Sequence, residues 1–183
     1  MPVPPLDLKA IWQAGQSYAE WLAASESAKR EEMERIYAEV LLTAEDIVFL
    51  GSIPKPVHIL ALSEDWCGDV RRHLPVLARM CAEDPILKLR VVEKASRPEL
   101  MVRYLTNGAE AIPIFVFLSS EFVEVGFWGP RPAECKLLMA RGKAAGNIDE
   151  ARAAIGRFYA TDRNRSTINE LTELFAIACA ERV

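Results

Sequence analysis

The residues of this 183-residue chain that could carry nucleophilic, redox or metal chemistry are few and widely spread. They are four cysteines and two histidines: Cys67, Cys81, Cys135 and Cys179, with His58 and His73. No two cysteines have the close spacing of zinc ligands, and the two histidines do not complete a ligand set. No glycine-rich phosphate loop precedes a helix. The sequence therefore predicts no metal site and no organic cofactor, and it leaves single thiols as the reactive groups.

Charge and hydropathy narrow the classes of partner. The chain has 26 acidic and 22 basic residues and a net charge of −4, which gives no positive field for nucleic acid. Its amino terminus lacks the basic start and long apolar run of a secretion signal, and the apolar run at 112–118 is too short to span a bilayer. We expect a cytoplasmic protein with no nucleic-acid or membrane partner; the oligomeric state is left open.

Short apolar runs alternate with helical periodicity through the middle of the chain, in the order β-α-β-α-β-β-α. Strands are expected at 57–62, 87–92, 112–118 and 121–128. A first helix is expected to open at 65–69 and to be kinked at Pro75. A second is expected to begin at Pro98 and to stop at Asn107-Gly108, and a third to begin near Pro132. The pattern is typical of an α/β protein with a buried central sheet.

Helical patterns flank this middle part on both sides. The first fifty residues carry an apolar stripe, with Ser27 as an expected N-cap, and the tail contains helices at about 148–159 and 167–181. Thr167 and Glu170 have the spacing of a capping box. Neither flank could bury enough surface alone, so residues 1–183 are expected to form one domain, with a core at about 53–141 and extensions at about 6–50 and 147–182.

The sequence Trp66-Cys67-Gly68-Asp69 at the first strand-to-helix turn, with Ile112-Pro113 before the third strand, resembles the thioredoxin superfamily. The resemblance covers roughly residues 53–141. It extends to bacterial thioredoxin-like proteins through the stretches 64–69, 104–108 and 128–132. It implies a thioredoxin-like fold, in which a central mixed sheet is flanked by helices, here with helical extensions at both ends.

By this resemblance Cys67 lies at the start of a helix, where unpaired backbone N–H groups and the helix dipole favour a thiolate. Pro113 would be a cis proline beside it, and the backbone of Ile112 would pair with an extended peptide or with glutathione. As an alternative, Pro113 serves only to shape the fold.

Other side chains would complete a substrate-binding groove around Cys67, together with Gly68 and Asp69. Trp66 and the loop 128–132 would flank the groove, and Arg131 could bind a carboxylate through two parallel hydrogen bonds. Each of these residues also has an alternative role that involves no substrate. Trp66 and Trp128 could serve in ordinary packing, Arg131 could be a solvated cation, and Asp69 could stabilise the first helical turn.

The chain departs from the thioredoxin pattern at two positions. Val70 occupies the place of the resolving cysteine, and Ala61 that of a buried aspartate which many thioredoxins use to move protons. Cys81 would lie about 21 Å along the same helix, outside disulfide reach. Both losses argue against an efficient dithiol reductase.

The remaining cysteines and histidines are expected to be structural. Cys135 and Cys179 are assigned to the core. His73 is out of phase with Cys67 on the helix and should not face the sulfur, and His58 is expected to be exposed or satisfied by a local partner.

The sequence leaves three hypotheses for the role of Cys67. The first is a monothiol oxidoreductase in cell redox homeostasis, whose partner is glutathione, another low-molecular-weight thiol or a protein thiol or disulfide. The second is a redox-inactive binding or scaffold module that uses the groove around Cys67 and Pro113. The third is a redox-sensing cysteine that forms a sulfenic acid.

Overall fold

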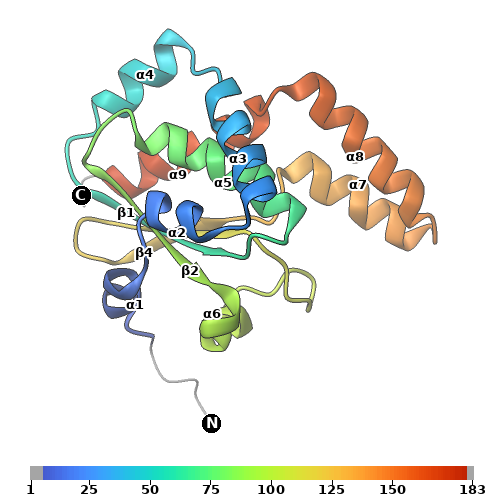
Figure 1. Ribbon diagram of the computed structural model, residues 1–183, viewed down its shortest axis with the longest axis horizontal. Helices are drawn as coiled ribbons and strands as arrows, with labels where there is room; N and C mark the ends of the chain where they lie inside the picture. The colour runs from blue at the N-terminus through green and yellow to red at the C-terminus, as the bar shows by residue number, and fades with distance from the viewer. Residues whose placement is uncertain (1–5, 181–183) are drawn as a thin grey trace.

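The computed structural model describes residues 6–180, which surround a four-stranded mixed sheet (Figure 1). Its strands are β1 (Val57–Ser63), β2 (Leu87–Glu93), β3 (Ile114–Leu118) and β4 (Glu124–Trp128), in the spatial order β2-β1-β3-β4. β1 is parallel to β2 and antiparallel to β3, and β3 is antiparallel to β4. The predicted α/β, thioredoxin-like architecture is confirmed.

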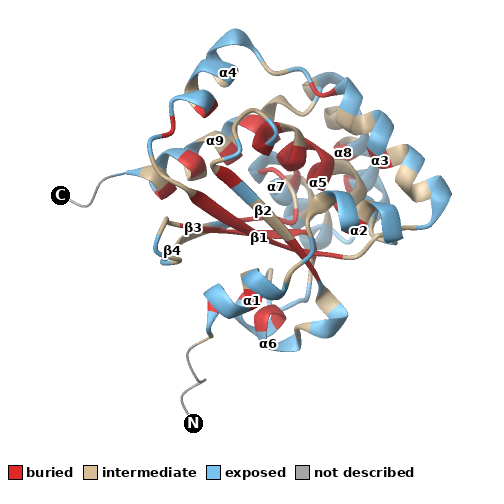
Figure 2. Cartoon of the chain, turned by 60° about the vertical axis from the view of Figure 1, so that its left-hand side comes forward, coloured by how far each residue is buried: buried red, intermediate tan, exposed pale blue. Residues whose placement is uncertain are grey.

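The two central strands form the middle of the core. Every residue of β1 and β3 is buried, as expected for strands that are covered on both faces (Figure 2). One face carries α5 (Gly68–Cys81) and α9 (Arg165–Cys179), and the other carries α1 (Leu8–Ala14) and α6 (Pro98–Arg103). The sheet therefore positions the segments that leave its strand ends, including the residues after β1.

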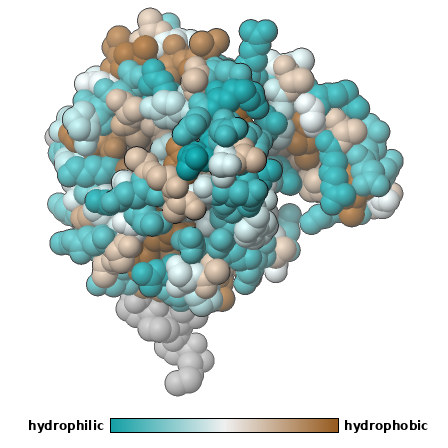
Figure 3. Space-filling model, in the orientation of Figure 1, coloured by the Kyte–Doolittle hydropathy of each residue, from teal (hydrophilic) through white to brown (hydrophobic). Residues whose placement is uncertain are grey.

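The remaining helices surround this centre. They are α2 (Tyr18–Ala24), α3 (Ser27–Glu39), α4 (Ala44–Gly51), the 3-10 helix η1 (Lys94–Ser96), α7 (Ala133–Ala144) and α8 (Ile148–Asp162). α3 packs on α5, and α7 packs on α8 to form a lobe that projects from the body of the molecule (Figures 1 and 3). Brown atoms gather over α4 in Figure 3, where Val48 is 72% exposed.

The amino-terminal extension also protects the edge of the sheet. Gln16 pairs with Val91 of β2 through two backbone hydrogen bonds of 2.9 and 2.8 Å. This contact covers part of an edge strand that would otherwise present unpaired backbone groups. Within residues 6–180, every helix is too short or too polar to cross a bilayer.

Several element ends differ from the sequence prediction: β3 begins at Ile114, α8 ends at Asp162 and α9 begins at Arg165, and two further differences have a clear local cause. Pro98 does begin α6, but the helix ends at Arg103, and Asn107-Gly108 instead forms a turn with positive φ angles of 50° and 76°. β4 begins at Glu124 rather than at residue 121, because Phe122 has a φ of 62° and the Ser119–Val123 turn closes before the strand pairs.

The predicted N-cap at Ser27 is wrong. Ser27 is the first residue of α3, and the residue before it, Glu26, makes no side-chain cap hydrogen bond. Complete capping boxes occur instead at α2, with Ser17 and Glu20, and at α4, with Thr43 and Asp46. In each pair the N-cap residue and the third helical residue have the spacing that lets each side chain bond the other's backbone N–H.

The predicted capping box of Thr167 and Glu170 is also wrong. α9 begins at Arg165, so Thr167 lies inside the helix, and its hydroxyl is 3.1 Å from Nδ1 of the buried His73. The Glu170 carboxylate accepts hydrogen bonds from Trp128 Nε1 at 2.6 Å and from the Ala133 backbone N–H at 2.8 Å. Both side chains are used in tertiary contacts, which override the local motif.

Candidate functional site

Cys67 is the N-cap of α5, directly after the loop that leaves β1. Its backbone N–H donates to the Glu64 carbonyl at 3.1 Å, and its carbonyl accepts the first helical hydrogen bond from Arg71 at 3.0 Å. The side chain is partly exposed, and no side chain caps the helix at this position. The sulfur therefore lies at the helix end where unpaired N–H groups favour negative charge.

The loop before β3 lies against this sulfur. Cys67 Sγ donates to the Ile112 carbonyl oxygen at 3.4 Å, and the peptide bond between Ile112 and Pro113 is cis. A Cβ atom on Gly129 would lie 2.0 Å from the Pro113 carbonyl oxygen, and Gly129 has a φ of 135°. Only glycine fits such a close approach. The segments at 67, 112–113 and 129 thus meet in one place.

Arg131 joins this group of segments through an internal ion pair. Its Nε is 3.0 Å from one Asp69 carboxylate oxygen, and its Nη2 is 2.6 Å from the other. The two parallel hydrogen bonds expected of Arg131 exist, but the carboxylate belongs to Asp69 and not to a substrate. The Asp69 carboxylate is therefore occupied by Arg131. The pair fixes the loop 129–132 against the first turn of α5.

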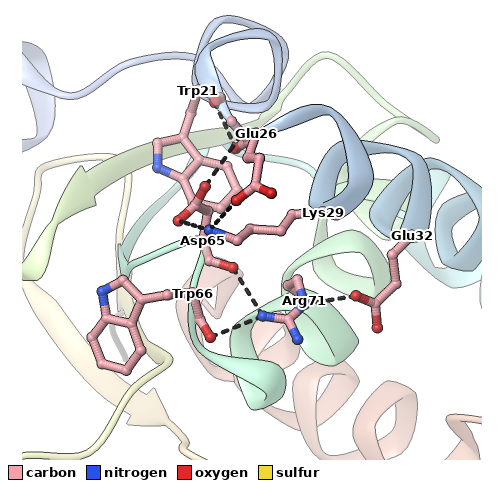
Figure 4. Close-up of polar contacts among 8 residues, drawn as sticks. Trp21, Glu26, Lys29, Glu32, Asp65, Trp66 and Arg71 are labelled. Atoms are coloured by element: carbon pink, nitrogen blue, oxygen red, sulfur yellow. Dashed lines mark hydrogen bonds and ion pairs between the residues drawn. The ribbon is translucent and has the colours of Figure 1, made fainter.

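The two tryptophans predicted to flank the groove have different surroundings. Trp66 is 60% exposed, next to Cys67, and Figure 4 shows its ring turned away from the neighbouring ion pairs. Trp128 is buried: its ring stacks on Phe115 at 5.2 Å, and its Nε1 donates to Glu170. The expectation for Trp128 is corrected, because its hydrophobic face is covered by the core. Only Trp66 offers a ring to a ligand.

α3 holds the loop before Cys67 through contacts that the sequence analysis did not find (Figure 4). Arg71 donates to Glu32 at 2.6 Å and to the carbonyls of Asp65 and Trp66 at 3.1 and 2.9 Å. Lys29 donates to the Asp65 carboxylate at 3.3 Å. The partners are 36 and 39 residues apart in the chain, so no local spacing indicates them.

His73 lies behind the site and takes no part in it. Its Nε2 is 3.0 Å from the Tyr159 hydroxyl, and its Nδ1 is 3.1 Å from Thr167 Oγ1. Complete burial, together with the nearby guanidinium groups of Arg72 and Arg131, lowers the pKa of His73 to about 3. The imidazole is therefore neutral near pH 7, and both of its nitrogens have partners other than Cys67.

The second histidine is buried and satisfied by a hydrogen-bond partner, one of the two outcomes expected for it. His58 Nδ1 is 3.1 Å from the Ser119 carbonyl oxygen, and its ring stacks on Phe122 at 3.9 Å. Burial lowers the pKa of His58 as well. Both histidines are thus structural groups.

The other thiols are placed differently from Cys67. All four cysteines are free, but Cys81 and Cys135 are buried, and burial raises the pKa of both thiols. Cys179 is partly exposed at the end of α9, with Sγ 3.4 Å from the Ala176 carbonyl. Val70 and Ala61 are fully buried. Among residues 6–180, no group of histidines, cysteines and acids could hold a metal ion.

Comparison with known proteins agrees with this geometry, because a thioredoxin family model matches residues 15–150. The chain belongs to the thioredoxin family. The match begins within the amino-terminal helices and extends into α8, beyond the core range of the sequence analysis. None of the curated proteins that were compared matches the chain.

Two solved structures share the fold of this thioredoxin-family protein. One is a protein of unknown function from Pseudomonas aeruginosa, with a TM-score of 0.74 and 18% identity, covering 94% of this chain and 98% of that one. The other is an HIV epitope-scaffold, with a TM-score of 0.67 and 17% identity, covering 92% and 96%. At these identities the likeness extends to the fold alone.

Proposed function

We propose that this thioredoxin-family protein performs monothiol thiol–disulfide exchange through Cys67. The observation that carries the proposal is the placement of this sulfur: it is partly exposed at the start of α5, and 3.4 Å from the Ile112 carbonyl. A thiolate is the nucleophile in disulfide exchange, and a helix amino terminus favours that form. Cys81 and Cys135 lack such a position because both are buried.

The proposed reaction has two balanced steps. The Cys67 thiolate attacks one sulfur of a mixed disulfide between a substrate and a low-molecular-weight thiol such as glutathione. The old S–S bond breaks, the substrate leaves as a thiolate, and Cys67 keeps the small thiol in a new disulfide. A second small thiolate then attacks the small-thiol sulfur, which forms the oxidised small thiol and releases the Cys67 thiolate. Two small-thiol sulfurs end oxidised, and the substrate sulfur ends reduced.

An external thiol is required because the helix offers no internal one. Val70 occupies the position one turn after Cys67, and it is fully buried. Cys81 is about 21 Å further along α5 at 1.5 Å per residue, while disulfides need Cα atoms within about 7 Å. The mixed disulfide must therefore be resolved from solution.

The surroundings of Cys67 favour an extended substrate with a small or apolar flank. The backbone at Ile112 lies beside the sulfur, so a peptide that paired with it would bring its own disulfide to Cys67. Gly68 is exposed and adds no side chain in front of the sulfur, and Trp66 offers a largely exposed ring. Arg131 contributes by fixing the loop rather than by binding substrate, because Asp69 fills its guanidinium fork.

The test is the release of glutathione from a glutathionylated model peptide in the presence of reduced glutathione, followed by mass spectrometry. We expect catalysis by the wild-type protein, complete loss in Cys67→Ser and full retention in the matched control Cys81→Ser. Equal rates in Cys67→Ser and wild type would refute the proposal. If the wild-type protein binds the peptide without exchanging it, and Cys67→Ser binds equally well, the redox-inactive binding module is the correct reading.

A further inference from the structure

A cavity of about 370 Å³ lies between α5, the second half of α3 and the junction of α8 with α9. In Figure 1 this junction runs beside α3. The volume is within the range of small-molecule sites, which is about 300–1,000 Å³. The cavity wall combines three arginines, two glutamates and the side chains of Ile36 and Leu41.

The two acids of the cavity already have cationic partners. Glu32 accepts from Arg71 at 2.6 Å, and Glu39 pairs with Arg35 at 3.1 Å. The other two arginines of the wall, Arg72 and Arg163, make no ion pair or side-chain hydrogen bond with any residue in the range 6–180. In a chain with a net charge of −4, the cavity therefore has an uncompensated positive charge.

Arg72 is held in place without an acidic partner. Its guanidinium carbon lies 4.3 Å from the centre of the Tyr159 ring, and the Tyr159 hydroxyl is in turn 3.0 Å from His73. A cation on an aromatic face is attracted to the ring, but the edges of its guanidinium plane keep their N–H donors. Arg72 is only partly exposed and lines the cavity.

Arg163 comes from a junction whose neighbouring charged residues, Asp162 and Arg165, are occupied. The Asp162 carboxylate accepts from the backbone N–H and hydroxyl of Ser166 at 3.1 and 2.6 Å, and Arg165 binds Asp46 through two hydrogen bonds of 2.7 and 2.9 Å. Arg163 and Asn164 both have left-handed backbones, with φ of 50° and 66°. Such backbones are costly for arginine. The junction is thus fixed on both sides, while the Arg163 side chain has no hydrogen-bond or ion-pair partner among residues 6–180.

We propose that this cavity binds a small organic oxyanion. Arg72 and Arg163 hold its carboxylate or phosphate head group, and Ile36 and Leu41 contact its apolar part. Guanidinium groups suit both head groups, because their parallel N–H donors match pairs of oxygens. Cys67 does not line this cavity, and binding there needs no covalent step, so the proposal does not depend on the exchange reaction.

The test uses three benzene derivatives in calorimetric titrations: phenyl phosphate, benzoate and the uncharged benzyl alcohol. We expect at least one of the two anions to bind saturably, with a dissociation constant at least tenfold lower than that of benzyl alcohol, and to bind less tightly as sodium chloride is added. The tighter anion identifies the head group. Equal binding of all three compounds, or no saturable binding of either anion, would overturn the proposal.

Variants locate the site. Arg163→Asn removes the charge with a residue that tolerates a left-handed backbone, and Arg72→Gln removes the other charge. Each should weaken binding of the tighter anion at least tenfold. The matched control Arg152→Asn removes an exposed charge elsewhere on α8 and should bind like wild type. Cys67→Ser should also bind normally, whether or not the exchange reaction exists. Wild-type affinity in both Arg163→Asn and Arg72→Gln would refute the assignment.

Discussion

The two ends of α5 carry the same residue type in opposite surroundings. Cys67 begins the helix, partly exposed and next to the Ile112 carbonyl, whereas Cys81 ends it in the core. Burial raises the pKa of the Cys81 thiol, because the core disfavours a thiolate. The comparison teaches that position on the helix, and not the presence of a thiol, separates a candidate nucleophile from a packing residue.

Polar groups along α5 are also satisfied in different ways. At the first turn, Asp69 and Arg71 reach outward to Arg131 and Glu32 on other segments. One turn further, His73 is enclosed and neutral, between Tyr159 and Thr167. The first turn is therefore fixed by charge pairs to other segments, and the middle of the helix by burial, while Arg79 near its end pairs with Glu83.

The largest expected difference is in alkylation. In the folded protein at pH 8, Cys67 should react with iodoacetamide roughly 100-fold faster than Cys81 or more, because a buried thiol with a raised pKa reacts only after local opening. Peptide mass spectrometry over time gives both rates. In denaturant the two rates should agree within about threefold. Equal rates in the folded protein would contradict the comparison.

The next largest effect concerns the stability contributed by neutral His73. Unfolded histidine titrates near 6.5, whereas His73 in the folded protein has a pKa of about 3. Between these values the unfolded chain binds a proton that the folded chain does not, so stability falls as pH is lowered below 6.5. The slope approaches about 1.4 kcal/mol per pH unit, or roughly 2.7 kcal/mol at pH 4.5.

His73→Gln removes this titration. Urea denaturation at pH 7 and pH 4.5 should show a difference in unfolding free energy that is smaller than in wild type by about 2–3 kcal/mol. His58→Gln is the control and should flatten the profile less, because His58 is less deeply buried. A profile in His73→Gln as steep as in wild type would show that the folded protein does protonate this imidazole.

A smaller effect is expected from the ion pair that fixes the first turn. Asp69 and Arg131 have side chains that are 20% and 27% exposed, between the surface and buried classes. A double-mutant cycle with Asp69→Asn and Arg131→Gln should give a coupling energy of about 1–2 kcal/mol in thermal or urea unfolding. A coupling energy indistinguishable from zero would mean that the loop 129–132 is fixed by packing alone.

The smallest effect is expected at the contact from α3. Glu32→Gln should lower the free energy of unfolding by about 0.5 kcal/mol, because the pair is partly exposed and Arg71 keeps its two backbone acceptors. Glu31→Gln, on an exposed position of the same helix, is the matched control and should have no measurable effect. Equal losses of unfolding free energy in the two variants would show that the ion pair of Glu32 with Arg71 adds no stability.

The order of elements and the position of Cys67 could be predicted because both depend on local patterns. Short apolar runs mark β1 and β3, and Pro98 marks the start of α6. Cys67 lies in the short turn between β1 and α5, and the resemblance of Trp66-Cys67-Gly68-Asp69 to thioredoxins implied its place at the helix start. These features are fixed by residues near each other in the chain.

The contacts that satisfy the site could not be predicted, since their partners are far apart in sequence. Arg131 reaches Asp69 across 62 residues, and Thr167 reaches His73 across 94. A threonine near the start of a helix has the same neighbours in the sequence whether its hydroxyl caps the helix or bonds a buried imidazole. The packing of α9 on α5 decides between these two roles of the threonine, and the residue spacing within α9 does not predict that packing.

The most direct test of the central claim is site-resolved mass spectrometry of all four cysteines after the folded wild-type protein is incubated with oxidised glutathione. The account predicts glutathione on Cys67, while Cys81 and Cys135 stay unmodified until the protein is unfolded in denaturant. The contradicting result is a Cys67 that stays unmodified in the folded protein but becomes glutathionylated on unfolding, because its place at the start of α5 would then give it no reactivity.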